Sequence, residues 1–227
     1  MKILGIDTAT DILGVALTED KELIVESRSN IKRAHAEKLV QTIEKILNEV
    51  KLNPIELDGI AVSIGPGSFT GLRIGLSAIK GLAFAADVPV ASVPTLDALV
   101  LQTQFYPYQV RPLVKAQGDE AYTALYHFEK GVLSRDSNYQ VININRISEL
   151  IREKTLILNI GMKNLEKCVH DEKRSLIEIA PREFCKTSGY AVARIGYEKL
   201  LKNDIEDINQ LEPFYLKNFK AIKKIGI

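Results

Sequence analysis

A glycine-rich stretch of the chain reads Ser63-Ile64-Gly65-Pro66-Gly67-Ser68-Phe69-Thr70-Gly71-Leu72-Arg73-Ile74-Gly75. It joins a predicted apolar strand, 59–64, to a predicted helix, 72–86. Glycines in such a turn allow positive φ angles and let backbone N–H groups approach an anion. No Gly-Lys-Ser/Thr follows and the spacing is not G-x-G-x-x-G, which excludes the common nucleotide-binding loops. We expect a contact site in the turn Gly65, Pro66, Gly67, Ser68, Phe69, Thr70 and Gly71.

The composition is that of an ordinary globular protein. The chain has 227 residues, of which 46% are hydrophobic and 26% charged, and its net charge is +1. With a net charge so close to zero, the chain lacks the overall excess of positive charge that is typical of nucleic-acid-binding proteins. We therefore expect RNA contacts to be local or made through a partner. Cys168 and Cys185 lack C-x-x-C spacing, and the N-terminus runs straight into a strand, which together predict a reduced, cytoplasmic location. The apolar runs fall short of the roughly 20 residues that span a bilayer, so we expect no membrane partner.

The pattern of apolar residues repeats along the chain and indicates an internal duplication. Two successive β-β-β-α-β-α units predict an α/β fold with two similar lobes facing across a cleft. The proline-containing aromatic break at 105–108 is the expected boundary. The domains are then 1–104 and 105–227, with the last segment packing back on the first lobe. Predicted strands are 2–6, 14–18, 23–28, 59–64, 89–93, 111–116, 121–128, 139–142, 156–160 and 177–179, and predicted helices are 35–50, 72–86, 95–104, 146–153 and 189–201.

Two of the predicted helices have different faces. Helix 35–50 carries one apolar stripe that begins at Leu39 and Ile43, as expected for a helix packed on a sheet. Helix 72–86 is apolar nearly all round, and its polar residues reduce to the row Arg73, Ser77 and Lys80. Such a helix is buried on most sides, either by a second layer of its own chain or by another protein. Both alternatives stay open on the pattern alone.

The turn after the first strand offers a second candidate site. Asp7, Thr8 and Thr10 follow a buried strand, and in two-lobed phosphotransferases such a turn binds a nucleotide phosphate and orients Mg²⁺. The simpler interpretation, which we favour, is a hairpin turn capped by Asp7. The matching turn of the second lobe begins with Lys115 instead of a carboxylate, which weakens the interpretation as an ATPase or a kinase.

Metal-dependent or nucleophilic catalysis has little support in the sequence. His35, His127 and His170 are scattered and form no metal-binding pair on one helix face. Ser68 lacks the G-x-S-x-G frame of a nucleophile elbow. We therefore expect no metal and no catalytic residue.

Several motifs resemble those of the bacterial TsaB (YeaZ) family of tRNA threonylcarbamoyladenosine biosynthesis proteins. They occur in the family's order and are strongest over the first hundred or so residues. The run from Gly65 to Gly75 is the most specific of them. The motifs are Ile6-Asp7-Thr8-Ala9-Thr10, Ala34-His35-Ala36-Glu37-Lys38-Leu39, Gly65-Pro66-Gly67-Ser68-Phe69-Thr70-Gly71-Leu72-Arg73-Ile74-Gly75 and Pro213-Phe214-Tyr215-Leu216-Lys217.

The resemblance implies the actin-like, Hsp70-like ATPase (ASKHA) fold and a role as the non-catalytic relative of the transferase TsaD. TsaD carries a metal site in an N-H-x-x-G-H type motif, whereas the corresponding stretch here, 94–99, contains no histidine. The family implies that TsaD, the small ATPase TsaE and, through the complex, tRNA are partners. It implies no cofactor of the chain's own, although a nucleotide (ATP or ADP) can lie at the junction with the partner. The family commonly has D-A-R where this chain has Lys115-Ala116-Gln117, so its contacts in the second lobe are not carried over.

The resemblance favours a partner interface over a second layer on helix 72–86. We also expect the chain alone to form a homodimer through the same helices, because an uncovered apolar face tends to pair with itself. A free-standing ATPase or small-molecule kinase and a metallopeptidase remain as rival functions. The expected interface residues are His35, Glu37, Leu39, Ile43, Leu72, Arg73, Ile74, Gly75, Ser77 and Ala78.

Overall fold

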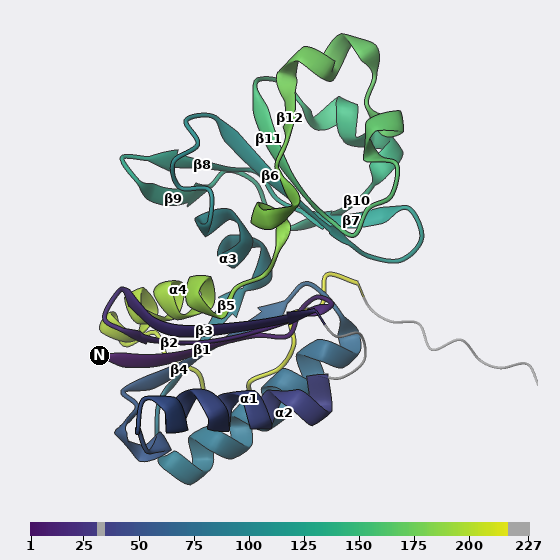
Figure 1. The fold of residues 1–227 in the computed structure, drawn as a ribbon. Coiled ribbons are helices and arrows are strands. Elements are labelled where there is room, and N and C mark those ends of the chain that lie inside the picture. Colours follow the sequence, from purple (N-terminus) through teal and green to yellow (C-terminus); the bar gives the residue numbers. More distant parts are fainter. Residues whose placement is uncertain (31–34, 218–227) are drawn as a thin grey trace, which may run out of the picture.

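The computed structural model describes residues 1–30 and 35–217 (Figure 1). In the first half of the chain, strands and helices alternate after an initial three-stranded meander. The elements are β1 (Lys2–Asp7), β2 (Ile12–Glu19), β3 (Glu22–Asn30), α1 (His35–Glu49), η1 (Pro54–Glu56), β4 (Gly59–Gly65), α2 (Phe69–Ala86), β5 (Val90–Pro94) and α3 (Thr95–Leu101), where η marks a 3₁₀ helix.

The second half has the same plan with shorter helices. Its elements are β6 (Gln109–Lys115), β7 (Glu120–Thr123), β8 (Tyr126–Glu129), β9 (Val132–Arg135), β10 (Gln140–Asn143), η2 (Ile144–Leu150), β11 (Thr155–Ile160), η3 (Leu165–Cys168), η4 (Asp171–Leu176), β12 (Ile177–Ile179), η5 (Arg182–Cys185) and α4 (Gly189–Leu201).

The described strands form two sheets with matching topology. The first has the order β3-β2-β1-β4-β5, and the second has β10-β7-β6-β11-β12 with the hairpin β8–β9 attached beside β6. In each sheet the first strand of the unit runs antiparallel to the second and parallel to the fourth. The sequence-predicted duplicated α/β fold is therefore confirmed, with one hairpin inserted in the second copy.

Helices cover both faces of the five-stranded sheet. Helices α1 and α2 lie side by side on one face, and α4 lies on the other (Figure 1). Leu39 of α1 and Leu76 of α2 join the larger core with Ile6 of β1. On the opposite face, Val192 of α4 packs with Ile3 of β1. These two apolar layers hold the sheet rigid, so that the ends of β1 and β4 are fixed relative to α2.

The last helix of each unit packs on the sheet of the other unit. Helix α3 follows β5, yet Leu99 packs with Val110 and Val114 of β6. Helix α4 follows β12, yet it contacts β1, β2 and β4 of the first sheet. Gly196 makes this approach close, because a Cβ on it would lie 2.2 Å from the Cβ of Ala61. The exchange ties the two lobes together through their helices.

Four predicted elements differ from the structure in type, in number or by more than two residues at one end. The predicted strand 121–128 is two strands, because β7 pairs with β10 whereas β8 pairs with β9. The predicted helix 146–153 is the 3₁₀ helix η2, since Ile144, Ile147 and Leu150 recur every third residue, which is the 3₁₀ period. Helix α3 ends at Leu101 instead of 104. Helix α2 begins at Phe69 instead of 72, and so absorbs part of the predicted turn.

Candidate functional site

The predicted glycine-rich turn is shorter than the sequence suggested. Strand β4 ends at Gly65, whose φ is +115°, and the peptide bond from Gly65 to Pro66 is cis. The side chain of Ser68 caps α2 by accepting a hydrogen bond from the N–H of Gly71 at 3.2 Å. Phe69, Thr70 and Gly71 are therefore the first turn of the helix, and the connection proper is 65–68.

The glycines of this region bring α2 against the β1–β2 turn. A Cβ on Gly67 would lie 2.3 Å from the carbonyl oxygen of Ala9, and a Cβ on Gly71 would lie 2.1 Å from that of Thr8. A Cβ on Gly75 would lie 2.3 Å from the hydroxyl of Thr8. These distances are shorter than any real contact of a side-chain carbon, so the space that we expected an anion to take is filled by the protein's own β1–β2 turn.

The candidate nucleotide residues lie beneath this contact. Asp7 and Thr8 are fully buried, and Thr10 is half-buried. The Asp7 Oδ1 atom accepts a hydrogen bond from the N–H of Ala9 at 2.9 Å, as in the hairpin cap that the sequence favoured. The hydroxyl of Thr10 lies 3.1 Å from that of Thr187. Asp7 and Thr8 are thus closed off from a phosphate, and Thr10 is engaged with the segment that leads into α4.

Burial sets the electrostatics of Asp7. Within the described residues, its Oδ2 atom and the hydroxyl of Thr8 are buried and lack hydrogen-bond partners. Burial raises the pKa of Asp7 from the ordinary 3.8 to about 6, and the hydrogen bond from Ala9, with the nearby hydroxyls of Thr187 and Ser63, only partly offsets this effect. Asp7 is therefore a buried acid that ionises at a cost, placed at the end of the central strand.

The closing motif forms part of a strap, residues 204–217, that crosses from the first sheet to the second. The N–H of Glu206 donates to the carbonyl of Val90 at 2.8 Å, and the N–H of Phe214 donates to the carbonyl of Ile64 at 2.7 Å. At its far end, Lys217 forms an ion pair with Glu120 of β7. The strap therefore covers the end of β4 and reaches the second lobe.

A three-residue cluster fastens the strap to the start of α2. The guanidinium carbon of Arg73 lies 3.7 Å from the ring centroid of Phe69, and Arg73 Nε donates to the hydroxyl of Tyr215 at 3.1 Å. The rings of Phe69 and Tyr215 are 5.3 Å apart. Cation–π and aromatic contacts of this kind stabilise by about 1 kcal/mol each. Arg73, an expected interface residue, thus also holds its own chain together.

The structure divides the expected interface residues into two groups. His35, Leu39, Ile43, Leu72 and Gly75 lie in the protein's interior, where they support the helices and are closed to a partner. The resemblance assigned them to the interface, but the stripe of Leu39 and Ile43 faces the sheet, as its pattern predicted, and burial removes all five from the surface that a partner can contact. Glu37, Arg73 and Ser77 are exposed, and Ile74 and Ala78 are half-buried. Ala34 of the same motif lies outside the described residues.

The exposed side of α2 carries more apolar surface than the expected interface residues suggested. Phe84 is 78% exposed and lies in the same row as Ser77 and Gly81. On α1, Val40 is 60% exposed. We call a selected part of the exposed and half-buried surface of these two helices, chosen around the apolar residues Val40 and Phe84, the α1–α2 face. It comprises Glu37, Val40, Arg73, Ile74, Ser77, Ala78, Gly81, Leu82, Phe84 and Ala85. Phe84 and Val40 escaped the sequence analysis, although their helical spacing from Ser77 and Glu37 was a usable signal.

The length and composition of α2 would also suit a membrane span. By these two criteria alone, the helix is long and apolar enough to cross a bilayer. Its other side, with Leu72, Leu76 and Ile79, is packed in the core. A helix that lies against a sheet passes the same test, so its apolar character is explained without a membrane.

The second-lobe turn and the metal-ligating residues give no further site. The turn that begins at Lys115 places Glu120 against Lys217 of the strap, not toward Asp7. In residues 1–30 and 35–217, three or more His, Cys, Asp or Glu side chains nowhere gather closely enough to hold a metal ion. The candidate functional site is therefore the α1–α2 face with the strap beside it.

Comparisons with known proteins identify the family of the chain. A sequence model of the TsaD family, described as tRNA N6-adenosine threonylcarbamoyltransferase, matches residues 24–217. The tRNA threonylcarbamoyladenosine biosynthesis protein TsaB of Bacillus subtilis is 32% identical over 229 residues, which cover 99% of this chain and 97% of that protein.

Solved structures show the same fold. YeaZ from Pseudomonas aeruginosa superposes with a TM-score of 0.80 at 23% identity, covering 95% of this chain and 99% of its own. Component A of the (R)-2-hydroxyglutaryl-CoA dehydratase of Acidaminococcus fermentans, which has the actin-like ATPase fold, gives a TM-score of 0.52 at 11% identity, with 88% and 99% covered. On its sequence, over nearly its whole length, this chain belongs to the TsaB (YeaZ) family.

Proposed function

We propose that this chain is a non-catalytic partner subunit of TsaD and is required for the threonylcarbamoylation of N6 of adenosine 37 in tRNAs that read codons beginning with A. In this proposal TsaD transfers the threonylcarbamoyl group from an adenylate made by a separate synthase. The chain's own part is to hold TsaD in a competent arrangement. TsaE joins the pair, and tRNA is reached through the complex.

The α1–α2 face carries the proposal. Gly81 and Ala78 keep its surface low, while Phe84 projects from it with 78% of its area exposed. An apolar helix surface made of small residues lets the backbone of a partner helix come close. A single projecting aromatic side chain can then insert into a pocket of the partner and contribute much of the binding energy. Relatives of the chain are named tRNA threonylcarbamoyladenosine biosynthesis proteins, and these names support a role in this tRNA modification.

The burial of the β1–β2 turn favours this role over a free-standing ATPase or kinase. A phosphotransferase would present Asp7 and Thr8 to a nucleotide, but both are fully buried under Gly71 and Gly75.

The same α1–α2 face would pair two copies of the chain when TsaD is absent, so that homodimer and heterodimer compete.

An arginine in the middle of the face tests the proposal. A Cβ on Gly81 would meet nothing within 4 Å, so Gly81→Arg is compatible with the fold. We expect this variant to lose binding to TsaD in calorimetric titration while keeping its melting temperature. Val132→Arg is the control, because Val132 is 68% exposed on the β8–β9 hairpin, away from α2. Undiminished binding by a folded Gly81→Arg variant would refute this interface.

A further inference from the structure

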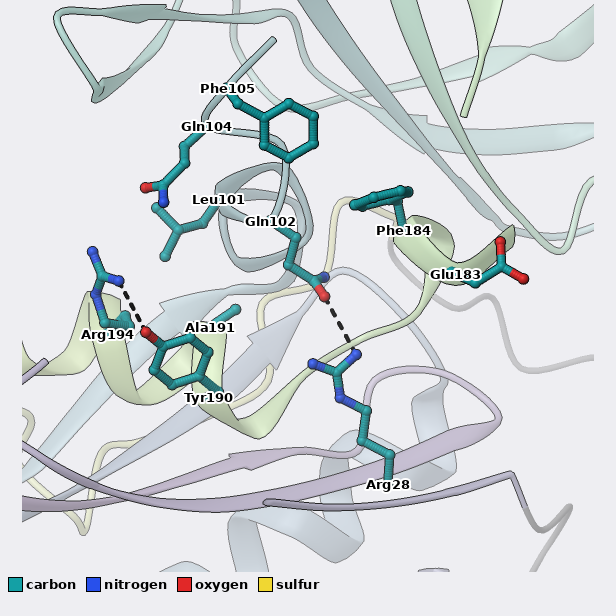
Figure 2. A pocket seen from close by; sticks show the side chains of 10 residues that line it. All are labelled: Arg28, Leu101, Gln102, Gln104, Phe105, Glu183, Phe184, Tyr190, Ala191 and Arg194. Carbon is teal, nitrogen blue, oxygen red and sulfur yellow. Dashed lines mark hydrogen bonds between the residues drawn. The ribbon is translucent and has the colours of Figure 1, made fainter. Parts of the chain in front are cut away.

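A pocket lies on the α4 side of the five-stranded sheet, away from the α1–α2 face. Its volume is about 380 Å³. Four parts of the chain build it: the end of α3 and the residues after it, the start of α4, η5 and strand β3 (Figure 2). The side chains used below are Arg28, Gln104, Phe105, Phe184, Tyr190 and Arg194. Nothing in the proposed docking to TsaD uses this pocket.

The two arginines of the pocket are in different states. Arg28 is neutralised by Glu26 at 2.9 Å and also donates to the hydroxyl of Ser188 at 2.8 Å. Arg194 donates to the hydroxyl of Tyr190 at 3.1 Å but, within residues 1–30 and 35–217, has no carboxylate partner. Glu183, the acidic residue of the lining, turns its carboxylate away from both arginines (Figure 2). Arg194 is therefore a positive charge available to an anion.

The other side of the pocket offers exposed aromatic rings. Phe105 and Phe184 are 68% and 36% exposed, and their rings meet edge to face with centroids 5.8 Å apart. Aromatic surface of this kind is where bases stack in nucleic-acid-binding proteins. Gln104 also lines the pocket, but its amide points away from the two rings, toward the side where Arg194 lies (Figure 2), and it makes no hydrogen bond within the described residues. The NH2 group of this amide can donate a hydrogen bond to an anion that lies beside Arg194.

We propose that this pocket binds a nucleoside monophosphate unit, either as a free nucleotide or as an unstacked nucleotide of single-stranded RNA. The base lies against Phe105 and Phe184, and the phosphate contacts Arg194 and the amide of Gln104. The volume is within the range of pockets that take small ligands. Because the pocket and the α1–α2 face lie on opposite sides of the sheet, a nucleotide and a protein partner can be bound together.

The first test is calorimetric titration of the full chain with AMP and with a short single-stranded oligoadenylate. We expect saturable one-to-one binding of at least one probe, with amide NMR shifts at Gln104, Phe105 and Arg194. Binding of AMP with no gain from the oligonucleotide identifies a free nucleotide as the source. Binding of the oligonucleotide alone identifies RNA. Binding of neither probe overturns the proposal.

Two variants and a control tie binding to the pocket. Arg194→Ala removes the charge-assisted contact and should weaken binding about tenfold or more, with partial rescue by Arg194→Lys. Phe105→Ala removes a stacking surface and should weaken it about tenfold. Arg152→Ala removes an exposed arginine outside the pocket and should leave affinity unchanged. Equal weakening by Arg194→Ala and Arg152→Ala would mean unspecific charge attraction, and unchanged affinity of Phe105→Ala would mean that no base stacks there; either result overturns the site. Because the chain is titrated without TsaD, this outcome is independent of the proposed partner role.

Discussion

The carbonyl oxygen of Thr8 takes the place that a side chain at Gly71 would need, since a Cβ there would lie 2.1 Å from it. The first turn of α2 and the β1–β2 turn are therefore packed backbone to backbone. The N–H of Ser68 adds a hydrogen bond to the carbonyl of Ala9 at 2.7 Å. The glycines of the motif serve this contact, and through it they set the angle at which α2 leaves the sheet.

Alanine at Gly71 should destabilise the protein, because the backbone of the β1–β2 turn has no freedom to yield. We expect Gly71→Ala to lower the free energy of unfolding by about 2–3 kcal/mol. Gly81→Ala is the matched control in the same helix. With open space around its Cβ, it should raise stability by about 0.5–1 kcal/mol. Urea denaturation measures both, and equal effects at the two positions would contradict the packing.

Asp7 should make stability depend on pH. Its pKa is raised in the folded protein, so between pH 4 and pH 6 the folded state holds a proton that the unfolded state has lost. Stability therefore falls as pH rises through this window. The rise of the pKa from 3.8 to about 6 corresponds to about 3 kcal/mol.

Asp7→Asn should remove this dependence. Relative to the wild type, the variant should gain stability as the pH goes from 4 to 7 and stay level above it, since the hydroxyls of Ser63 and Thr187 can accept from an amide as well as donate to a carboxylate. Asp11→Asn, in the same turn but exposed, is the control. Thermal unfolding across this range provides the measurement, and parallel curves for wild type and Asp7→Asn would contradict it.

Loss of Tyr215 should loosen the strap without unfolding the sheet. We expect Tyr215→Ala to speed hydrogen exchange at the amide of Phe214, which bonds to Ile64, while amides of β1 keep their protection. The ring contact with Phe69 and the bond from Arg73 together suggest a loss of about 1–2 kcal/mol. Tyr108→Ala serves as control, because Tyr108 contacts Tyr106 and Lys154 instead. Unchanged exchange at Phe214 would show that the strap is held elsewhere.

Phe84 should be the anchor of the α1–α2 face. An exposed aromatic residue at the centre of an interface commonly contributes 2 kcal/mol or more, so Phe84→Ala should weaken binding to TsaD about 30-fold. Val40→Ala, on the neighbouring helix, should cost less. Surface plasmon resonance separates the two, and an unaffected Phe84→Ala variant would move the interface away from the last turn of α2.

Much of the fold was predictable because many of its strands and helices coincide with local patterns of apolar and turn residues. The strands β1, β2, β4 and β11 and helix α4 follow apolar runs bounded by turn residues, and the repeat of their order predicted the duplication. The hairpin β8–β9 was not predictable, because the break between β7 and β8 depends on pairing with β9 and β10, distant partners that no local pattern names.

The site was predictable only in part. Periodicity located α1 and α2 and correctly turned the stripe of Leu39 and Ile43 toward the sheet, whereas the family resemblance placed these residues in the partner interface. For α2, which is apolar nearly all round, the pattern did not say which side meets the sheet, so Leu72 could not be assigned. The match of Gly71 and Gly75 to Thr8 is a contact across many residues of sequence, and so is the bond from Arg73 to Tyr215. Only the folded chain brings these pairs together.

Reconstitution of the tRNA modification tests the central claim most directly. Threonylcarbamoyl adenylate, TsaE and an unmodified tRNA that reads a codon beginning with A are incubated with TsaD, with this chain, or with both, and modified adenosine is measured by mass spectrometry of the digested tRNA. A non-catalytic partner predicts product with both proteins and little with either alone. Product from this chain without TsaD, or equal product from TsaD without this chain, would contradict the account.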